Sequence, residues 1–108
     1  MYIPAQGDWV YINFDPSIGP EIRKRRPGLV VSKNAFNKLT GFCLICPITS
    51  THRAFGTYVT IANPREILEE VVTHQLRSVD FERRNLDFIE RCDPVTWAKV
   101  IATMDQFI

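Results

Sequence analysis

Short apolar runs, separated by proline, glycine and charged residues, follow one another along most of the chain. β-Branched and aromatic residues fill these runs, and in several of them apolar and polar positions alternate, which is typical of half-buried strands. Residues 86–92 fit a further strand or one helical turn, and residues 32–41 fit a loop or a short helix that ends at Gly41. Strands are predicted at residues 9–14, 29–31, 42–48, 55–61 and 71–79.

The C-terminal segment has a helical period instead. Asp93 is a suitable N-cap, and Pro94 suits the first helical position. Apolar residues then recur at i, i+4, i+7 and i+11, at Trp97, Ile101, Met104 and Ile108. This spacing predicts an amphipathic helix of about four turns that packs on the sheet. The predicted fold class is mainly β, with residues 1–108 as one domain that forms a small antiparallel barrel or a strongly curved sheet with a C-terminal helix.

The composition is that of a globular domain. The chain has 108 residues, of which 45% are hydrophobic, and this is enough to build a packed core. No run approaches the roughly 20 apolar residues of a membrane span, and the N-terminus lacks the basic and apolar regions of a secretion signal. We therefore expect a cytoplasmic protein without a membrane partner, whose three cysteines form no disulfide.

Two of these cysteines have the spacing of a metal or redox motif. Cys43 and Cys46 lie in the strand predicted at residues 42–48, however, and strand residues three apart point to opposite faces. They are therefore predicted to be buried core thiols rather than a shared pair of ligands. We expect neither a metal nor another cofactor.

Charge is concentrated in one segment between the first two strands. The net charge is only +1, yet residues 23–26 are four consecutive cations in a loop that also contains Glu21. A local cluster of this kind matters more for binding an anion than the total charge does. A sheet does not need such a loop in order to fold, so we interpret the loop as the functional part of the chain.

Several short motifs surround this loop in a defined order. Gly7-Asp8 precedes the first apolar run, and Phe14-Asp15-Pro16 ends it. Gly19-x-Glu21, Arg26-Pro27, Val30-Val31-Ser32, Pro47-Ile48-Thr49-Ser50 and the run from His74 to Asp80 follow. Over nearly the whole chain this order resembles the MazF/PemK family of toxin ribonucleases. The chain departs from the family at Pro20 and at residues 22–25, where the family commonly has small residues, glutamine and glycine, so the behaviour of the loop does not carry over.

The resemblance implies a CcdB/MazF-like fold with an SH3-like barrel, which acts as a homodimer. It also implies a sequence-specific endoribonuclease that cleaves single-stranded RNA without a metal and is silenced by a cognate antitoxin. Carried over by position, the family's catalytic arginine is Arg26, its catalytic threonine is Thr49 and its loop acid is Glu21.

These residue types suit cleavage in which the neighbouring 2′-hydroxyl is the nucleophile. The enzyme must then position the phosphate, stabilise its added negative charge and supply a proton to the leaving oxygen. The planar guanidinium of Arg26 matches a phosphate, and the Thr49 hydroxyl can donate or accept one hydrogen bond. Glu21 either orients Arg26 or takes the proton of the 2′-hydroxyl.

A second group of polar residues is expected to contact RNA. Cations in the loop suit backbone phosphates, and the same cations suit an acidic, disordered segment of an antitoxin. The other members lie beside Thr49 or where the family shows a glutamine. The group is Arg23, Lys24, Arg25, Ser50, His52 and Gln75.

Two other functions remain open for this fold. A CcdB-like toxin would bind DNA gyrase through its terminal helix and final residues, and a related protein would bind RNA without cutting it. The combination of Glu21, Arg26 and Thr49 favours the nuclease, because a gyrase-binding protein does not need it.

Overall fold

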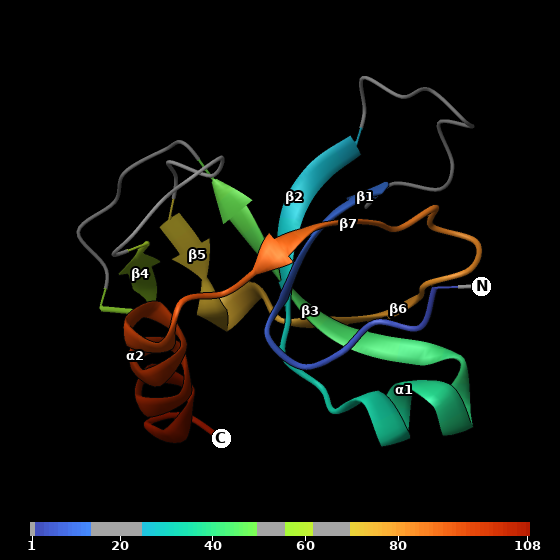
Figure 1. The fold of residues 1–108 in the computed structure, drawn as a ribbon. Helices are drawn as coiled ribbons and strands as arrows, with labels where there is room; N and C mark the ends of the chain where they lie inside the picture. Colours follow the sequence, from blue (N-terminus) through green and yellow to red (C-terminus); the bar gives the residue numbers. More distant parts are fainter. Residues whose placement is uncertain (1, 14–24, 50–55, 62–69) are drawn as a thin grey trace.

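The computed structural model describes residues 2–13, 25–49, 56–61 and 70–108 (Figure 1). Within these residues, strands are the most frequent elements and one longer helix follows the last of them, as the hydrophobic pattern predicts. The elements in chain order are β1 (Asp8–Asn13), β2 (Arg25–Val30), α1 (Asn34–Thr40), β3 (Phe42–Thr49), β4 (Tyr58–Thr60), β5 (Glu70–Val72), the 3₁₀ helix η3 (Thr73–Gln75), β6 (Arg77–Asp80), β7 (Asp87–Arg91) and α2 (Pro94–Asp105).

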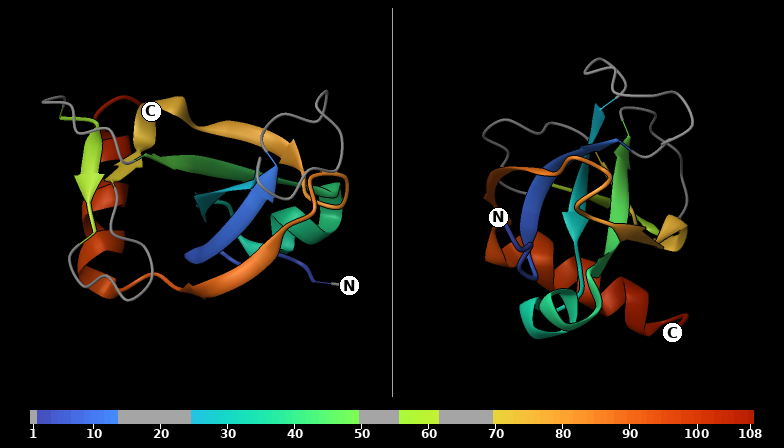
Figure 2. Two further views of the ribbon diagram at one scale, coloured as in Figure 1. Left: turned by 90° about the horizontal axis from the view of Figure 1, so that it is seen from above. Right: turned by 90° about the vertical axis from the view of Figure 1, so that its right-hand side faces the viewer.

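The strands form one antiparallel, strongly curved sheet. Its order is β4-β5-β3-β2-β1-β7, and β6 pairs with the first half of β3 beside β5. Figure 2 shows the strands curving around an interior, with α2 at one end. In the part of the chain that the structure describes, no pairing joins β6 to β7. Of the two predicted forms, the structure is therefore the open, curved sheet rather than the closed barrel.

Strand β3 lies between two hydrophobic clusters because its side chains alternate between the faces of the sheet. Cys46 and Ile48 join the cluster that α2 covers, whereas Cys43 and Ile45 join the cluster on the other face. Burial raises the pKa of Cys43 and of Cys46 to about 12. The prediction that these cysteines are core thiols on opposite faces is confirmed.

The strand predicted at residues 71–79 is wrong as a single element. The chain forms β5, turns through η3 and continues as β6. The turn is fixed at Thr73, which is fully buried and donates from its backbone nitrogen (3.0 Å) and its hydroxyl (2.7 Å) to the carbonyl oxygen of Thr57. A polar residue satisfied in this way interrupts the strand, so that its two halves pair with different parts of β3.

The predicted start of α2 is confirmed, whereas its predicted buried face is only partly correct. The Asp93 carboxylate accepts a hydrogen bond of 2.9 Å from the backbone nitrogen of Thr96 and so caps the helix. Thr96, Val100 and Met104 are the buried residues of α2, and Trp97 packs beside them. Ile101 and Ile108 are 37% and 78% exposed. The large apolar residues predicted a buried face of α2 that is rotated about the helix axis from the observed face. The observed face includes the buried Thr96.

Helix α1 is held against the N-terminal segment by one buried side chain. It ends at Gly41, whose φ of 74° is left-handed, as the sequence predicts. Asn37 is fully buried, and its amide nitrogen donates to the carbonyl oxygens of Pro4 (2.9 Å) and Ser32 (3.2 Å). The Ser32 hydroxyl donates to the Asn37 amide oxygen and accepts a hydrogen bond from the backbone nitrogen of Leu44 (2.8 Å).

The Gly7-Asp8 motif joins the two ends of the chain. Gly7 has a φ of 93°; its nitrogen donates to the Val30 carbonyl oxygen (2.8 Å), and its own carbonyl accepts from the nitrogen of Cys92 (2.7 Å). A Cβ atom at Gly7 would lie 3.3 Å from the Arg91 guanidinium, which forms an ion pair with the buried Asp8. The motif therefore secures β1 between β2 and the start of α2.

Candidate active site

The predicted catalytic arginine lies near the start of β2, and the predicted catalytic threonine is the last residue of β3. Figure 1 shows that these two strand ends lie at the end of the sheet away from α1. Strands β2 and β3 pair in the register Val30 with Ile45, Leu29 with Cys46, and Gly28 with Pro47. Continued by two residues, this register makes Arg26 the counterpart of Thr49. Counterparts on antiparallel strands share a face of the sheet. The pairing of β2 with β3 ends at Gly28 and Pro47, and Arg26 and Thr49 lie two residues beyond it, at the same end of the two adjacent strands.

Arg26 is the second residue of β2, and its backbone lies opposite Ile12 of β1. Its side chain is exposed. Among the described residues, none forms a hydrogen bond or an ion pair with its guanidinium. An arginine stays charged at any ordinary pH, so Arg26 presents a positive, planar hydrogen-bond donor at the end of the sheet.

Thr49 is half-buried at the last position of β3, and its Cα atom lies opposite Glu70. Glu70 is only 9% exposed, and its Oε2 accepts a hydrogen bond of 3.0 Å from the Thr60 hydroxyl. The sequence did not single out this buried carboxylate, because the segment before residue 71 is ambiguous in its pattern. The sequence offers only a weak indication that Glu70 is buried, namely that this acid directly precedes the β-branched pair Val71-Val72.

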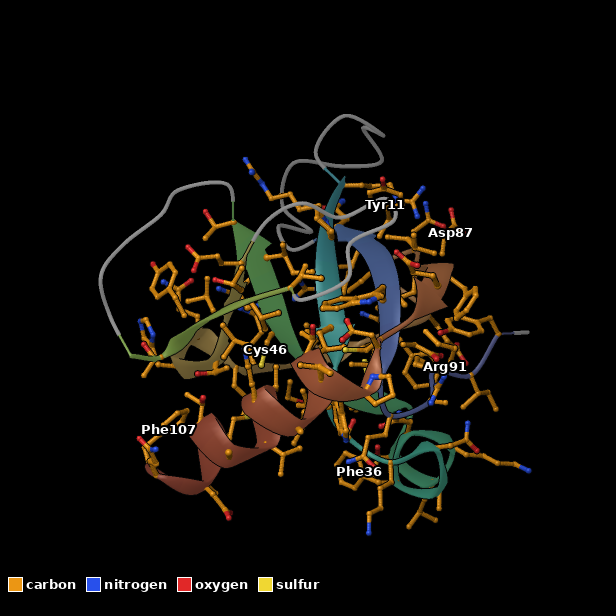
Figure 3. All side chains as sticks on the ribbon, turned by 60° about the vertical axis from the view of Figure 1, so that its left-hand side comes forward. Tyr11, Phe36, Cys46, Asp87, Arg91 and Phe107 are labelled. Carbon is orange, nitrogen blue, oxygen red and sulfur yellow. The ribbon has the colours of Figure 1, made fainter. Side chains whose placement is uncertain are left out.

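Arg25 differs from its neighbour, although both were predicted to lie in the loop. Both belong to β2, and they point to opposite faces because they are adjacent on a strand. The Arg25 guanidinium forms an ion pair of 2.7 Å with Asp87 and donates to the Tyr11 carbonyl oxygen at 3.4 Å. It also lies 6.0 Å from the centroid of the Tyr11 ring, and its side chain is only 14% exposed. Figure 3 shows Tyr11 and Asp87 close together at this end of the sheet.

The remaining predicted residues fall into two groups. Gln75 lies on η3, which packs against β3, and its side chain is exposed. Its neighbour His74 shares a hydrogen bond of 2.8 Å between Nδ1 and the Thr57 hydroxyl. The others lie outside the described residues, and their roles stay predictions: Glu21, Arg23, Lys24, Ser50 and His52.

Two further features concern the described residues, 2–13, 25–49, 56–61 and 70–108. In these ranges, no three histidine, cysteine, aspartate or glutamate side chains are grouped so that they could hold a metal ion. No helix among the same residues is long and apolar enough to cross a membrane. At the shared end of β2 and β3, the described residues offer a guanidinium, a hydroxyl and the Glu70 carboxylate opposite Thr49.

Solved structures define the class of fold. MazF from Deinococcus radiodurans superposes with a TM-score of 0.85 at 30% sequence identity, and the match covers 98% of this chain and 96% of that one. A MazE–MazF complex from the same organism gives a TM-score of 0.85 at 27% identity and covers 98% and 95% of the two chains. The protein therefore has the MazF fold, a curved antiparallel sheet with a C-terminal helix.

Sequence relatives narrow the class to a family. Residues 5–108 match the family described as PemK-like, MazF-like toxin of type II toxin-antitoxin system, and the chain belongs to this family. The endoribonuclease toxin MazF of Escherichia coli K12 is 30% identical over 83 residues, which cover 77% of this chain and 74% of that protein. The endoribonuclease toxin ChpB of the same strain is 36% identical over 85 residues, covering 73% and 72%.

Proposed function

We propose that this chain is the toxin of a type II toxin-antitoxin system and a sequence-specific endoribonuclease that cleaves single-stranded RNA in the cytoplasm. The observation that supports the proposal is that Arg26, whose side chain is exposed, and Thr49 lie at the same end of the adjacent strands β2 and β3. Membership of the family and the names of the two Escherichia coli relatives support the same activity.

In the proposed mechanism, the 2′-oxygen of the RNA attacks the adjacent phosphorus while the bond to the 5′-oxygen breaks. The products are a 2′,3′-cyclic phosphate and a free 5′-hydroxyl, so one proton leaves the 2′-hydroxyl and one is added to the 5′-oxygen. Arg26 donates hydrogen bonds to the phosphoryl oxygens, where negative charge builds up, and Thr49 assists with one further hydrogen bond. Glu21 orients Arg26 or accepts the 2′-hydroxyl proton, and the reaction needs no metal ion.

A further set of polar residues would hold the RNA around the cleaved bond. Arg23 and Lys24 would contact backbone phosphates, and Ser50, His52 and Gln75 would contact the neighbouring nucleotides. Phosphate contacts of this kind make affinity fall steeply with salt. Measuring RNA affinity at several salt concentrations, with and without Arg23→Gln and Lys24→Gln, would test this part of the proposal.

The proposal includes two protein partners. We expect a homodimer that binds RNA across its interface, and a cognate antitoxin whose acidic, disordered segment covers the cations of the loop. The complexes of Deinococcus radiodurans MazF with MazE make an antitoxin partner a natural expectation. Light scattering of the purified protein tests the dimer. Unchanged antitoxin affinity after neutralising Arg23 and Lys24 would contradict the second part.

The main experiment incubates the purified protein with a long single-stranded RNA in EDTA, beside the Arg26→Ala variant, and maps the ends of the fragments. Discrete cuts with 2′,3′-cyclic phosphate ends, absent in the variant, are the expected result. A 2′-deoxy substitution at a mapped site should block that cut alone. Intact RNA with a folded protein would favour the gyrase-binding or RNA-binding alternatives. Because Phe107 and Ile108 are exposed at the end of the chain, a gyrase supercoiling assay would follow (Figure 3).

A further inference from the structure

The ion pair between Arg25 and Asp87 joins strands that are far apart in sequence. Arg25 begins β2 and Asp87 begins β7, with β1 between the two strands in the sheet. In the register of these strands, Asn13 lies opposite Arg25, and Tyr11 lies opposite Asp87. The Arg25 side chain therefore extends across β1, over the Tyr11 ring, to reach the carboxylate.

Among the described residues, the Arg25 guanidinium has few polar contacts. Its Nη2 atom makes both polar contacts, with Asp87 and with the Tyr11 carbonyl oxygen, whereas its Nε–H is buried and has no partner among the described residues. Of these contacts, only the one with Asp87 carries a full opposite charge. Among the described residues, removing that charge would leave a largely buried cation whose remaining polar contact is one carbonyl oxygen. A buried cation without an opposite charge is unfavourable, so the Arg25 side chain should move away from this position.

We propose that Asp87 is a positioning residue for Arg26, and this inference rests on the proposed ribonuclease function. By holding Arg25 on one face, Asp87 fixes the direction of the first residues of β2. Arg26 is then directed to the opposite face, which is the face of its counterpart Thr49. A strand's first residues fray readily, and catalysis is sensitive to misplacement of a charge-stabilising group by about 1 Å.

Asp87 has a second effect, which predicts the kinetic pattern. The ion pair neutralises Arg25, so Arg25 does not compete with Arg26 for the phosphate. When Asp87 loses its charge, Arg25 becomes an additional free cation near the RNA. The binding of RNA should then stay equal or become tighter while the chemical step slows. A variant that only loosened the fold would not give this combination.

The experiment measures kcat and KM for one defined single-stranded RNA containing a mapped cut site. Asp87→Asn should lower kcat about tenfold with an equal or lower KM, and Asp87→Glu should restore most of kcat. Arg25→Gln should lower kcat by a similar factor, and the double variant Arg25→Gln/Asp87→Asn should be no worse than either single variant. Glu82→Gln removes an exposed carboxylate from the turn before β7 and is the matched charge control, expected to behave as wild type.

The outcomes separate this inference from the proposed function. Absence of cleavage by the wild-type protein would overturn both. Cleavage by wild type with unchanged kcat in Asp87→Asn would overturn the positioning role alone, as would losses in the two single variants that multiply in the double variant. A raised KM together with a lowered melting temperature in Asp87→Asn and Asp87→Glu would show a role in folding or binding, and would also overturn it.

Discussion

The buried amide of Asn37 allows a sharp prediction about stability. Asn37→Ala removes two hydrogen bonds that the amide donates to backbone carbonyl oxygens and one that it accepts from the Ser32 hydroxyl. Pro4 and Ser32 are themselves buried, so the oxygens left behind gain no water. At about 1 kcal/mol for each hydrogen bond, the free energy of unfolding should fall by about 3 kcal/mol. For a chain of this size, that loss lowers the melting temperature by roughly 10–20 °C.

The same helix provides a matched control. Asn34 also donates to the Pro4 carbonyl oxygen, at 3.2 Å, but its side chain is exposed. In Asn34→Ala the Pro4 oxygen keeps its hydrogen bond from Asn37, so this variant should cost less than about 0.5 kcal/mol. Asn37→Asp keeps the size of the side chain and loses both amide donations, so it should be destabilised nearly as much as Asn37→Ala.

Urea denaturation followed by circular dichroism measures these differences, provided that the slope of free energy against urea is the same in all variants. Because α1 lies away from the candidate site, cleavage at low temperature should be unchanged in each folded variant. If Asn37→Ala lowered the free energy of unfolding by less than about 1 kcal/mol, or by the same amount as Asn34→Ala, the reasoning would be refuted. Burial would then not determine how much these hydrogen bonds contribute to stability.

Four further predictions follow from other parts of the molecule. Arg26→Ala should lower the cleavage rate by about 10²–10³ without changing the melting temperature, as fragment mapping and calorimetry would show. Leu29→Ala, which opens a cavity in the cluster under α2, should cost about 2–5 kcal/mol in urea denaturation. Asp93→Ala removes the cap of α2 and should cost about 1 kcal/mol by the same assay. Buried Cys43 and Cys46 keep their protons up to a pKa of about 12, whereas unfolded thiols ionise near 9.0, so stability should fall as pH rises from about 9 to 12. Replacing both cysteines by alanine should flatten that slope in melting curves against pH.

The parts of the fold that follow from local pattern were predictable from the sequence. Alternation indicated β1, a near-continuous apolar run indicated β3, and the Asp93-Pro94 pair indicated where α2 begins. The single strand at residues 71–79 failed because the buried hydroxyl of Thr73 finds its partner at Thr57, 16 positions away in the chain. The prediction of the buried face of α2 was partly wrong for a related reason. Packing against the sheet, rather than the size of the apolar side chains, determines which residues of the helix are buried.

The candidate site was predictable only in its central residues. Arg26 and Thr49 came from the resemblance to a family, and the fold places them at the same end of two adjacent strands. Sequence alone could not separate Arg25 from Arg26, since the difference depends on Asp87, which lies 62 residues further along the chain. The buried position of Glu70 likewise depends on the pairing of β5 with β3 and β4.

The hydrogen bonds of Gly7 also bear on the order in which the fold forms. Gly7 bonds to Val30 and to Cys92, and β1 pairs with both β2 and β7. During synthesis, β1 emerges from the ribosome first and β7 among the last elements, so one edge of β1 stays unpaired for most of translation. Contacts between such distant segments slow folding, because a long loop must close before they form. The sheet is therefore completed only late, when the end of the chain reaches its beginning.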